Sequence, residues 1–432
     1  AGGSRTVSAS MIAAALSLAS EPAARQEEPA AVTPAAKAAR GPTTSRLTII
    51  KDRVRRHSLF KPAYVHPGAG GHKSDALQLS QIGTLFGRKG NHVLLGLLTE
   101  TDTGAILLSD EDGSIPLDLS RAHTTGGFFT PSSVVLVEGS VNDAGVFEVE
   151  ALGHPPFERG AHHDHRADQE GPVDGGMLLV FSEVHLDHAE TLVKLEVVLR
   201  GYEIAGKQLM GDGASAKPFA DTFTFVFCGN FSSTPYSPEV PRSKVKLLFR
   251  RFAELLGRFP LLKEHARFIF VAGPSDASLG PAATLEHPPL SEVLCADLRA
   301  VLTHCHFAGN PARFTLGSQQ VVLYREEVMA RLKRGALVPP SEEGDTSLSE
   351  HLVDSILQQA HLCPLPSAVA TSYEPSAFIL DRPPDVLIIA ERRAQFTTDH
   401  AGTTAFNPGS FSSSGRWMVY HAHMRKAESS SI

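Results

Sequence analysis

Residues 223–230, FTFVFCGN, decide the fold of the second half of the chain. The run from Phe223 to Phe227 is apolar apart from one β-branched threonine, which is typical of a strand buried on both faces. Three further apolar runs also end in short polar loops: residues 177–185 (MLLVFSEVH), 268–276 (FIFVAGPSD) and 386–393 (VLIIAERR). Because helical patterns lie between these runs, we expect a layered α/β domain over residues 177–432. Its strands would carry the four loops at their carboxyl ends.

Apolar residues at spacings of three and four predict the helices of this domain. The clearest pattern lies around Lys244–Arg258, and Pro260 ends it. Gly201 is expected to end a helix that begins near Ala189. We also expect helical segments at 290–302 and 348–362, and a strand at 321–323.

Residues 77–158 show a different pattern of short strands and tight turns. We expect strands at 92–99, 105–108, 114–119, 134–141 and 146–152, with a glycine-containing hairpin turn at 142–145. This pattern predicts a small Greek-key barrel of the OB type. Such barrels often bind single strands through aromatic and basic residues, but here the strands offer almost no aromatic residue beyond Phe147. A structural or protein-binding barrel is therefore favoured.

The chain before the barrel divides into two parts. Residues 1–45 are rich in Ala, Pro, Ser and Glu, which predicts a disordered, low-complexity N-terminus. Residues 46–76 begin with a basic stretch whose apolar residues predict a linker that docks on the core. In the alternative interpretation, Arg53, Arg55 and Arg56 contact the phosphates of nucleic acid.

Composition limits the function classes that fit the chain. Its 432 residues carry a net charge of −7 and a sequence pI of about 6.3. Bulk electrostatics therefore give no reason to expect tight binding to nucleic acid. No apolar run approaches the roughly 20 residues that a membrane span needs. These features predict a soluble intracellular protein with no membrane partner.

Cysteine and histidine residues give little support for a metal centre. The four cysteines show no C-x-x-C pairing, which favours a reducing compartment and disfavours a disulfide framework. Residues 304–306 (HCH) resemble a ligand set, but they follow a helical pattern, and we expect a turn with partly buried side chains there. Residues 162–165 (HHDH) lie in a polar linker predicted at 159–176, where solvated side chains are favoured over zinc ligands.

Several short sequence words point to one family. They are IPLDLSRA (115–122), FVFCGNFSSTPY (225–236), HLCPLP (361–366), PDVLIIAE (384–391) and NPGSF (407–411). Through them the chain resembles the B-subunit family of replicative DNA polymerases, and within it the branch of DNA polymerase epsilon. The resemblance covers about residues 46–415. It implies a multidomain fold, an OB-type β-barrel plus an α/β calcineurin-like phosphoesterase domain that is active in archaeal relatives and inactive in eukaryotic ones.

The resemblance also implies which residues stand at the old metal-ligand positions of the first two loops. Glu183 stands where the ancestral D-x-H motif has Asp, and His185 keeps the imidazole. Asn230 replaces the bridging Asp of the G-D motif, and Ser233 replaces its second ligand. Two metal ions a few ångströms apart need a dense set of carboxylates and imidazoles, so these changes weaken the site.

The other two loops depart further from the pattern. Pro274 and Ser275 replace the Asn and His of G-N-H-[DE], whereas Asp276 survives. Glu391 and Arg393 replace the two His of the late G-H-x-H motif. The resemblance therefore implies no catalytic residue, no bound metal and no cofactor. An alternative is a single metal ion held by the three remaining groups of the first and third loops.

The implied function is that of a non-catalytic accessory subunit in nuclear DNA replication. Its partner would be the zinc-bearing C-terminal region of the catalytic subunit of DNA polymerase epsilon, and DNA would be reached through the complex. The replicative helicase is a second implied partner, although only about 45 low-complexity residues precede Arg46, where the family has a small helical domain. Two other hypotheses stay open: a divergent metal-dependent phosphodiesterase and an independent single-strand-binding OB protein.

Overall fold

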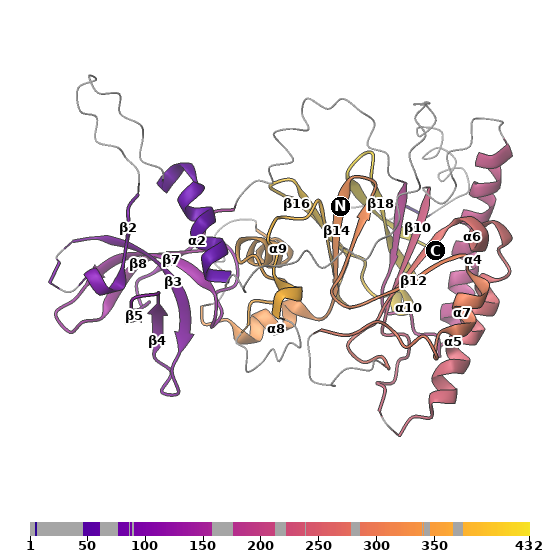
Figure 1. Cartoon of the computed structure of the whole chain (residues 1–432), viewed down its shortest axis with the longest axis horizontal. Coiled ribbons are helices and arrows are strands. Elements are labelled where there is room, and N and C mark those ends of the chain that lie inside the picture. The colour runs from indigo at the N-terminus through magenta and orange to yellow at the C-terminus, as the bar shows by residue number, and fades with distance from the viewer. Residues whose placement is uncertain are drawn as a thin grey trace, which may run out of the picture.

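The computed structural model shows a β-barrel beside a larger α/β domain (Figure 1). The predicted disorder of residues 1–45 and the polar linker at 159–176 lie outside the described residues, apart from Arg5–Thr6 and Gly176. The structure describes residues 5–6, 46–60, 77–157 except 86 and 89, 176–211, 222–277 except 238, 286–340 except 339, 346–365 and 375–432.

Five strands close the barrel in the order β3-β4-β5-β8-β7 and back to β3, with β5 and β8 parallel. Leu98, Leu108 and Phe147 are among the buried residues of its core. The predicted OB-type barrel is confirmed. The strands are β3 (His92–Glu100), β4 (Ile106–Ser109), β5 (Ser114–Asp118), β7 (Val134–Val141) and β8 (Phe147–Gly153), with short additions at β2 (Leu79–Ser80), η2 (Ile82–Thr84) and β6 (His123–Thr124).

Glycine is required at two positions of the β7–β8 hairpin. Gly145 lies in its turn with a φ of 78°, a left-handed conformation that glycine adopts without strain. Gly139 follows a register shift in β7, and a Cβ there would lie 2.0 Å from the carbonyl oxygen of Glu148. The hairpin turn therefore lies where the sequence predicted it.

The α/β domain contains two stacked sheets. The first has the order β1-β19-β18-β9-β10-β11-β12, and its four strands from β9 to β12 are parallel. The second has the order β13-β14-β15-β17-β16. The strands of the first sheet are β1 (Arg5–Thr6), β9 (Met177–Phe181), β10 (Phe223–Cys228), β11 (Arg267–Val271), β12 (His304–Ala308), β18 (Arg416–His421) and β19 (Lys426–Ser431). Those of the second are β13 (Ala312–Leu316), β14 (Gln319–Arg325), β15 (Val386–Ala390), β16 (Phe396–His400) and β17 (Thr403–Asn407).

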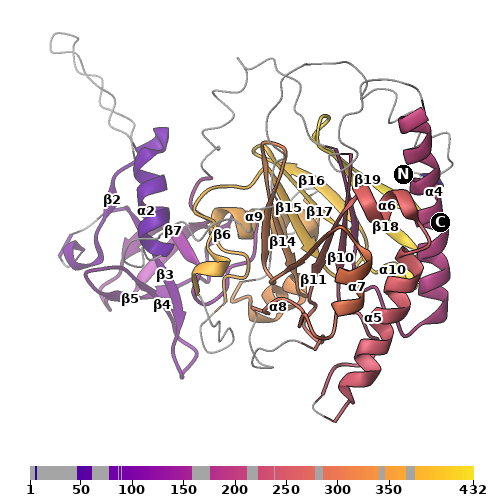
Figure 2. The same ribbon diagram turned by 45° about the vertical axis from the view of Figure 1, so that its right-hand side comes forward.

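Helices cover the outer face of each sheet, so the domain has four layers (Figure 2). Val226, Ile269 and Ile388 are among the residues that fill the space between the sheets. Burying such side chains stabilises the fold by about 1.5–3 kcal/mol each. The first sheet is covered by α4 (Ala189–Gly211), α5 (Arg242–Leu256), α6 (Pro260–His265) and α7 (Ala296–Val301), and the second by α8 (Val328–Gly335), α9 (Leu348–Gln358) and η4 (Pro375–Phe378).

Two local predictions in this domain are wrong. Helix α4 does not end at Gly201 but continues to Gly211. A glycine inside a helix costs about 1 kcal/mol, and the burial of Tyr202 and Ala205 in the next turn offsets that cost. Residues 304–306 do not form a turn but begin β12, which pairs with β11 at the edge of the first sheet. Their side chains are partly buried, as expected.

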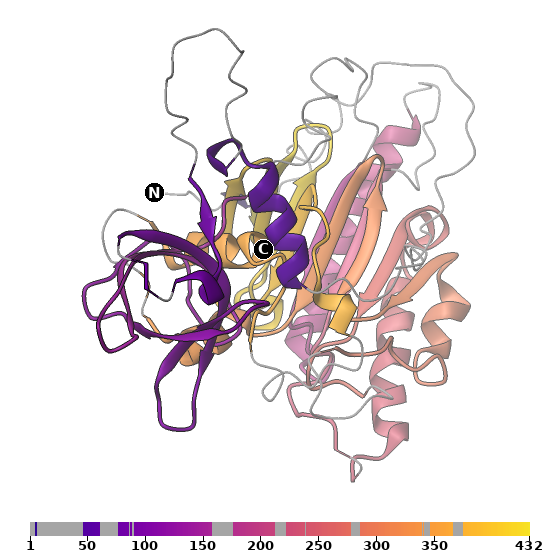
Figure 3. The same ribbon diagram turned by 60° about the vertical axis from the view of Figure 1, so that its left-hand side comes forward.

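The barrel is attached to the α/β domain through the end of α9. The side-chain amide of Gln359 accepts from the backbone N–H of Val134 (2.8 Å) and donates to its carbonyl oxygen (2.7 Å). Ser355 accepts a hydrogen bond of 2.7 Å from the backbone of Phe128. A further helix, α2 (Arg46–Arg56), lies along the barrel, as Figure 3 shows, and is followed by η1 (Ser58–Phe60).

Candidate functional site

The loops that follow β9, β10 and β11 meet at the carboxyl edge of the first sheet. The backbone N–H of Glu183 donates to the carbonyl oxygen of Gly229 (3.3 Å), and the N–H of Ser275 donates to the side-chain oxygen of Asn230 (2.9 Å). Parallel neighbours end at the same edge, so their loops converge there. We call this place the crevice.

Glu183 is buried in the crevice, and both of its carboxylate oxygens are engaged. Oε1 accepts from Arg325 Nη2 and from Asn230 Nδ2 (3.0 Å). Oε2 lies 2.9 Å from His185 Nε2 and 3.0 Å from Arg392 Nε. Burial alone would raise the pKa of Glu183, but the hydrogen bond from His185 and the charges of the two arginines lower it to about 2. The carboxylate is therefore charged and fully paired.

Arg325, at the end of β14, supplies the cation of this pair. Its side chain is only 1% exposed. Besides Glu183, it donates to the carbonyl oxygen of Gly229 (2.7 Å), to that of Ala390 (3.0 Å) and to Glu327 Oε1 (3.1 Å). Burial would lower the pKa of Arg325, but the neighbouring carboxylates raise it. One guanidinium thus joins both sheets at their carboxyl edges.

Sequence reasoning missed Arg325, although a signal for it was present. The strand predicted at 321–323 extends in the structure over Gln319–Arg325, and two glutamates follow its last residue. A strand end with this composition is a fifth polar loop of the same kind as the other four. Arg325 does not stand at an ancestral ligand position, so the family resemblance does not point to it.

Asp276 holds the crevice loops together. Its Oδ1 accepts from the backbone N–H of Phe231 (2.7 Å), and its Oδ2 accepts from that of Gly273 (2.8 Å). Burial raises the pKa of Asp276 to about 6, although these two hydrogen bonds act in the opposite direction. Its oxygens therefore accept hydrogen bonds from the backbone of two neighbouring loops.

Glu391 lies at the end of β15 and is also buried. Its Oε1 accepts from the backbone N–H of Met329 (2.6 Å), at the start of α8. Burial raises the pKa of Glu391 to about 7, and the charge of Glu327 adds to the shift. The carboxyl group caps a helix rather than facing open solvent.

The remaining predicted positions lie at the surface. Ser233 is exposed, and its hydroxyl donates to Asp187 Oδ2 (2.5 Å). Arg393 and Arg392 are exposed as well, although Arg392 reaches back to Glu183. Of the predicted ligand positions, the structure therefore brings Glu183, His185 and Asn230 into direct contact, and Asn230 also accepts from the backbone of Ser275.

The crevice residues do not fit a metal ion. A metal-binding carboxylate needs free oxygen lone pairs, whereas each carboxylate oxygen of Glu183 is already engaged by two protein groups. The buried guanidinium of Arg325 also places a positive charge where a cation would bind. Within the described part of the chain, no three His, Cys, Asp or Glu side chains are grouped so that they could hold a metal ion.

The three arginines predicted as possible DNA contacts differ in exposure. Arg53 is buried, and it donates to the carbonyl oxygens of Leu380 (2.8 Å) and Leu357 (3.3 Å). It therefore anchors α2 and does not offer its charge at the surface, contrary to the interpretation as a nucleic-acid contact. Arg55 and Arg56 are exposed. None of the helices that the structure describes is both long and apolar enough to cross a membrane.

The fold and the crevice together define a class of protein, an OB-type barrel joined to an α/β domain of two stacked sheets, with a buried ion pair in the crevice. A family model described as "DNA polymerase epsilon subunit 2-like, OB-fold domain" matches residues 36–156, and a model of the B subunit of DNA polymerases alpha and epsilon matches residues 178–398. The chain belongs to the DNA polymerase epsilon subunit 2 family. The expected class, a non-catalytic accessory subunit, is the class of this family.

Individual relatives agree with this assignment. The chain is 31% identical over 412 residues to the B subunit of DNA polymerase epsilon from Arabidopsis thaliana, covering 90% of this chain and 75% of the relative. It is also 31% identical over 416 residues to "DNA polymerase epsilon subunit 2" of Homo sapiens, covering 90% and 74%. Among solved structures, an archaeal phosphodiesterase is similar over 59% of this chain and 98% of that chain, with 10% identity and a TM-score of 0.29. A likeness at that level says nothing further about function.

Proposed function

We propose that this chain is the accessory subunit of a nuclear DNA polymerase epsilon and that it acts as a scaffold, holding the zinc-bearing C-terminal region of the catalytic subunit. Family membership supports a role inside the polymerase complex. The crevice supports a role without chemistry of its own, because its buried charges are used to bind loops to one another. DNA and the replicative helicase would be reached through the complex.

One observation supports the non-catalytic role above all others, namely the position of Arg325. Its guanidinium holds the carboxylate of Glu183 and two backbone carbonyl groups from different strands. Removing a single partner from such a buried pair costs about 3–5 kcal/mol, so the arrangement cannot open readily to admit a cation. We infer that Glu183, His185, Asn230, Ser233, Asp276, Glu391 and Arg393 are vestigial ligand positions.

The scaffolding proposal is tested by co-expressing the full chain with the C-terminal region of the catalytic subunit. We expect the two to elute as one stoichiometric complex in size-exclusion chromatography. Separate elution at micromolar concentration would overturn the proposal. In a control purification, a chelator removes zinc from the partner. Loss of the complex in this control would mean that the chain binds the zinc-dependent fold of the partner.

The non-catalytic proposal needs a separate measurement. In calorimetric titrations with Mn²⁺, the wild type and His185→Ala should give the same heat of binding. The two proteins should also cleave a phosphodiester at the same rate. Manganese-dependent cleavage that His185→Ala abolishes would instead support a divergent phosphodiesterase. The two experiments are independent, so either proposal can fail alone.

Direct contact with single-stranded DNA is a weaker proposal for this chain. Arg55 is exposed, but it lines a groove together with Asp110, Glu111 and Asp112, which repel phosphate. Salt-sensitive binding of a single strand that weakens when Arg55 and Arg56 are both neutralised would support such a contact. We expect no such binding by the isolated chain.

A further inference from the structure

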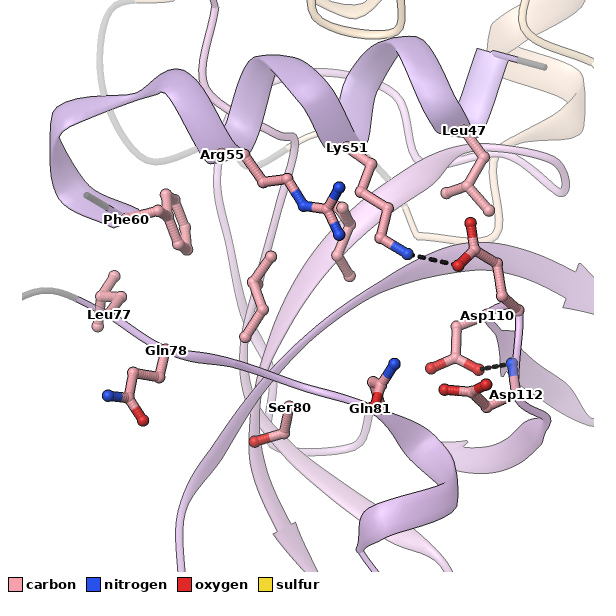
Figure 4. Close-up of a pocket in the computed structure, with 13 residues that line it drawn as sticks. Leu47, Lys51, Arg55, Phe60, Leu77, Gln78, Ser80, Gln81, Asp110 and Asp112 are labelled. Carbon is pink, nitrogen blue, oxygen red and sulfur yellow. Dashed lines mark hydrogen bonds and ion pairs between the residues drawn. The ribbon is translucent and has the colours of Figure 1, made fainter. Parts of the chain in front are cut away.

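A groove of about 600 Å³ lies between α2 and the edge of the barrel (Figure 4). A volume of this size is typical of sites that bind small ligands or short peptide segments. Leu47, Phe60, Leu77, Leu79 and Leu95 give it an apolar lining. The groove is separate from the crevice, because none of the residues that line it belongs to the α/β domain.

Helix α2 forms one wall of the groove and is held firmly in place. Ile50 and Val54 are fully buried against the barrel and the end of α9. The buried guanidinium of Arg53 adds two hydrogen bonds to backbone carbonyl groups of the α/β domain. The groove is therefore preformed, which lowers the entropic cost of binding.

The opposite wall is an edge strand. β2 lies at the end of the sheet order, and β3 is its only partner among the strands that the structure describes. Five consecutive residues, 77–81, line the groove. Leu79 and Ser80 are adjacent in the two-residue strand β2 and point to opposite faces, yet both line the groove, so the backbone itself borders the space. An exposed edge of this kind can pair with an extended peptide through main-chain hydrogen bonds.

An apolar end, a cation and a carboxylate follow one another along the groove. Figure 4 shows Phe60 and Leu77 at one end, Arg55 beside them, and Asp112 at the other end. Arg55 is 63% exposed, and its ion-pair partner Asp52 is 3.9 Å away and half exposed, so that pair is weak. Asp112 makes no ion pair with any residue that the structure describes. These two charges are therefore available to a ligand.

The other charges near the groove are already used. Lys51 bridges the groove to Glu111 at 2.6 Å. Asp110 accepts from the backbone N–H groups of Ile82, Asp112 and Gly113 at 2.8–3.0 Å, so it serves to hold its own turn. The recognition pattern thus reduces to an apolar end, one cation and one carboxylate.

We infer that this groove binds an extended peptide segment of a partner protein in which an aliphatic, an acidic and a basic residue occur in that order at alternate positions. The backbone of the segment pairs with β2. Its aliphatic side chain lies against Phe60 and Leu77, its acidic group meets Arg55 and its basic group meets Asp112. Alternate residues of an extended peptide face the same side, which allows all three contacts at once.

A nucleic acid strand fits this groove less well. Single strands need basic residues with aromatic stacking surfaces, whereas this groove offers one aromatic ring and an acidic turn. The peptide proposal does not depend on the proposed scaffolding role, because it rests only on the residues that line the groove. Either can fail without the other.

The test uses the full chain and a fluorescein-labelled probe, Gly-Ser-Leu-Ser-Glu-Ser-Lys-Ser-Gly, followed by fluorescence anisotropy at low salt. A second probe exchanges the Glu and the Lys. We expect the first probe to bind at least about fivefold more tightly, since two exposed charge contacts become two repulsions. Equal affinity for the two probes, or no binding of either, would overturn the proposal.

Charge-swap variants locate the site. Arg55→Glu should weaken binding of the first probe at least about fivefold, and the double variant Arg55→Glu with Asp112→Lys should prefer the second probe. Both residues are exposed, so neither change should unfold the chain. Arg121→Glu is the matched control, because Arg121 is an exposed arginine of the barrel that does not line the groove. An unchanged preference in the double variant would show that binding occurs elsewhere.

Two further outcomes would also overturn the proposal. Replacing residues 61–76 with a Gly-Ser linker should leave binding of the first probe unchanged. Binding that occurs only in that variant would mean that the chain's own segment competes for the groove. Displacement of the first probe by an oligothymidylate would assign the groove to nucleic acid instead.

Discussion

The crevice and the groove both bring opposite charges together, but they differ in exposure to water. In the crevice, Glu183 and Arg325 are 2% and 1% exposed, and each is engaged by several partners. In the groove, Lys51 and Glu111 are 24% and 57% exposed, and Arg55 is more exposed still. Buried charges need partners to be tolerated at all, whereas exposed charges are stable alone.

This difference separates a structural site from a binding site. The crevice at the carboxyl edge of the first sheet is filled by the chain's own hydrogen bonds. The place with open volume and available charges lies on the barrel, between α2 and β2. If the comparison is right, charge changes in the crevice alter stability and charge changes in the groove alter binding.

The largest effect is expected from Arg325→Met. The change leaves the buried carboxylate of Glu183 without its main counter-charge and should lower the free energy of unfolding by about 3–5 kcal/mol. Urea denaturation followed by circular dichroism measures it. Adding Glu183→Gln should recover at least about 1 kcal/mol, because the two side chains interact directly. Simple additivity of the two changes would contradict the assigned ion pair.

The second effect is a dependence of stability on pH. The pKa of Glu391 in the folded chain is about 7, above its ordinary value of 4.5, so folding favours the protonated form. Its stabilising contribution is present below pH 4.5 and is lost as the pH rises through 7. The loss amounts to about 3 kcal/mol, at about 1.4 kcal/mol for each pH unit between the two values. Asp276 acts in the same direction between its ordinary pKa of 3.8 and about 6.

Glu391→Gln tests this dependence. The amide cannot ionise and can still accept from Met329, so the variant should be up to about 3 kcal/mol more stable than the wild type at pH 8 and similar at pH 4.5. Glu183 behaves in the opposite way, because its pKa is lowered to about 2. Its contribution is present above pH 4.5 and is lost as the pH falls towards 2. The urea midpoints of Glu391→Gln and the wild type are compared between pH 4.5 and pH 8. Identical curves for the two proteins would contradict the raised pKa of Glu391.

A smaller effect is expected from Arg53→Met, which removes the anchor between α2 and the α/β domain. The carbonyl oxygens of Leu357 and Leu380 lose a charged donor, which costs about 1.5–3 kcal/mol. Hydrogen exchange measured by mass spectrometry should show faster exchange in residues 46–56. Arg56→Met, an exposed neighbour on the same helix, is the control. Equal exchange rates in the two variants would mean that Arg53 does not hold the helix.

The sequence predicted both domains of this fold because their signals are local. Alternating strands with glycine turns defined the barrel, and continuous apolar runs defined β9, β10, β11 and β15. The apolar runs also located the edge where Glu183 and Asn230 meet. Helix ends were less predictable, because tertiary burial carried α4 past Gly201.

The part of the site that could not be predicted depends on long-range contacts. Arg325 pairs with a residue 142 positions away, and no local pattern distinguishes it from a surface arginine. Arg53 is a second example, because a basic helix suggested a surface for phosphates whereas the fold buried one of its arginines. A resemblance can say which ligands were lost, but only the structure shows which group now neutralises the charge that remains.

The smallest effect is expected from Lys51→Met, which removes the ion pair across the groove. Glu111 is more than half exposed, so losing its partner should change the free energy of unfolding by less than about 1 kcal/mol. The same change removes the charge that spans the groove, so binding of the Leu-Glu-Lys probe should change measurably, whereas Arg325→Met should leave that binding intact in the folded fraction. Urea denaturation and fluorescence anisotropy on both variants give the four values needed. A loss of stability from Lys51→Met as large as that from Arg325→Met would remove the distinction between a buried structural pair and an exposed pair at a binding groove.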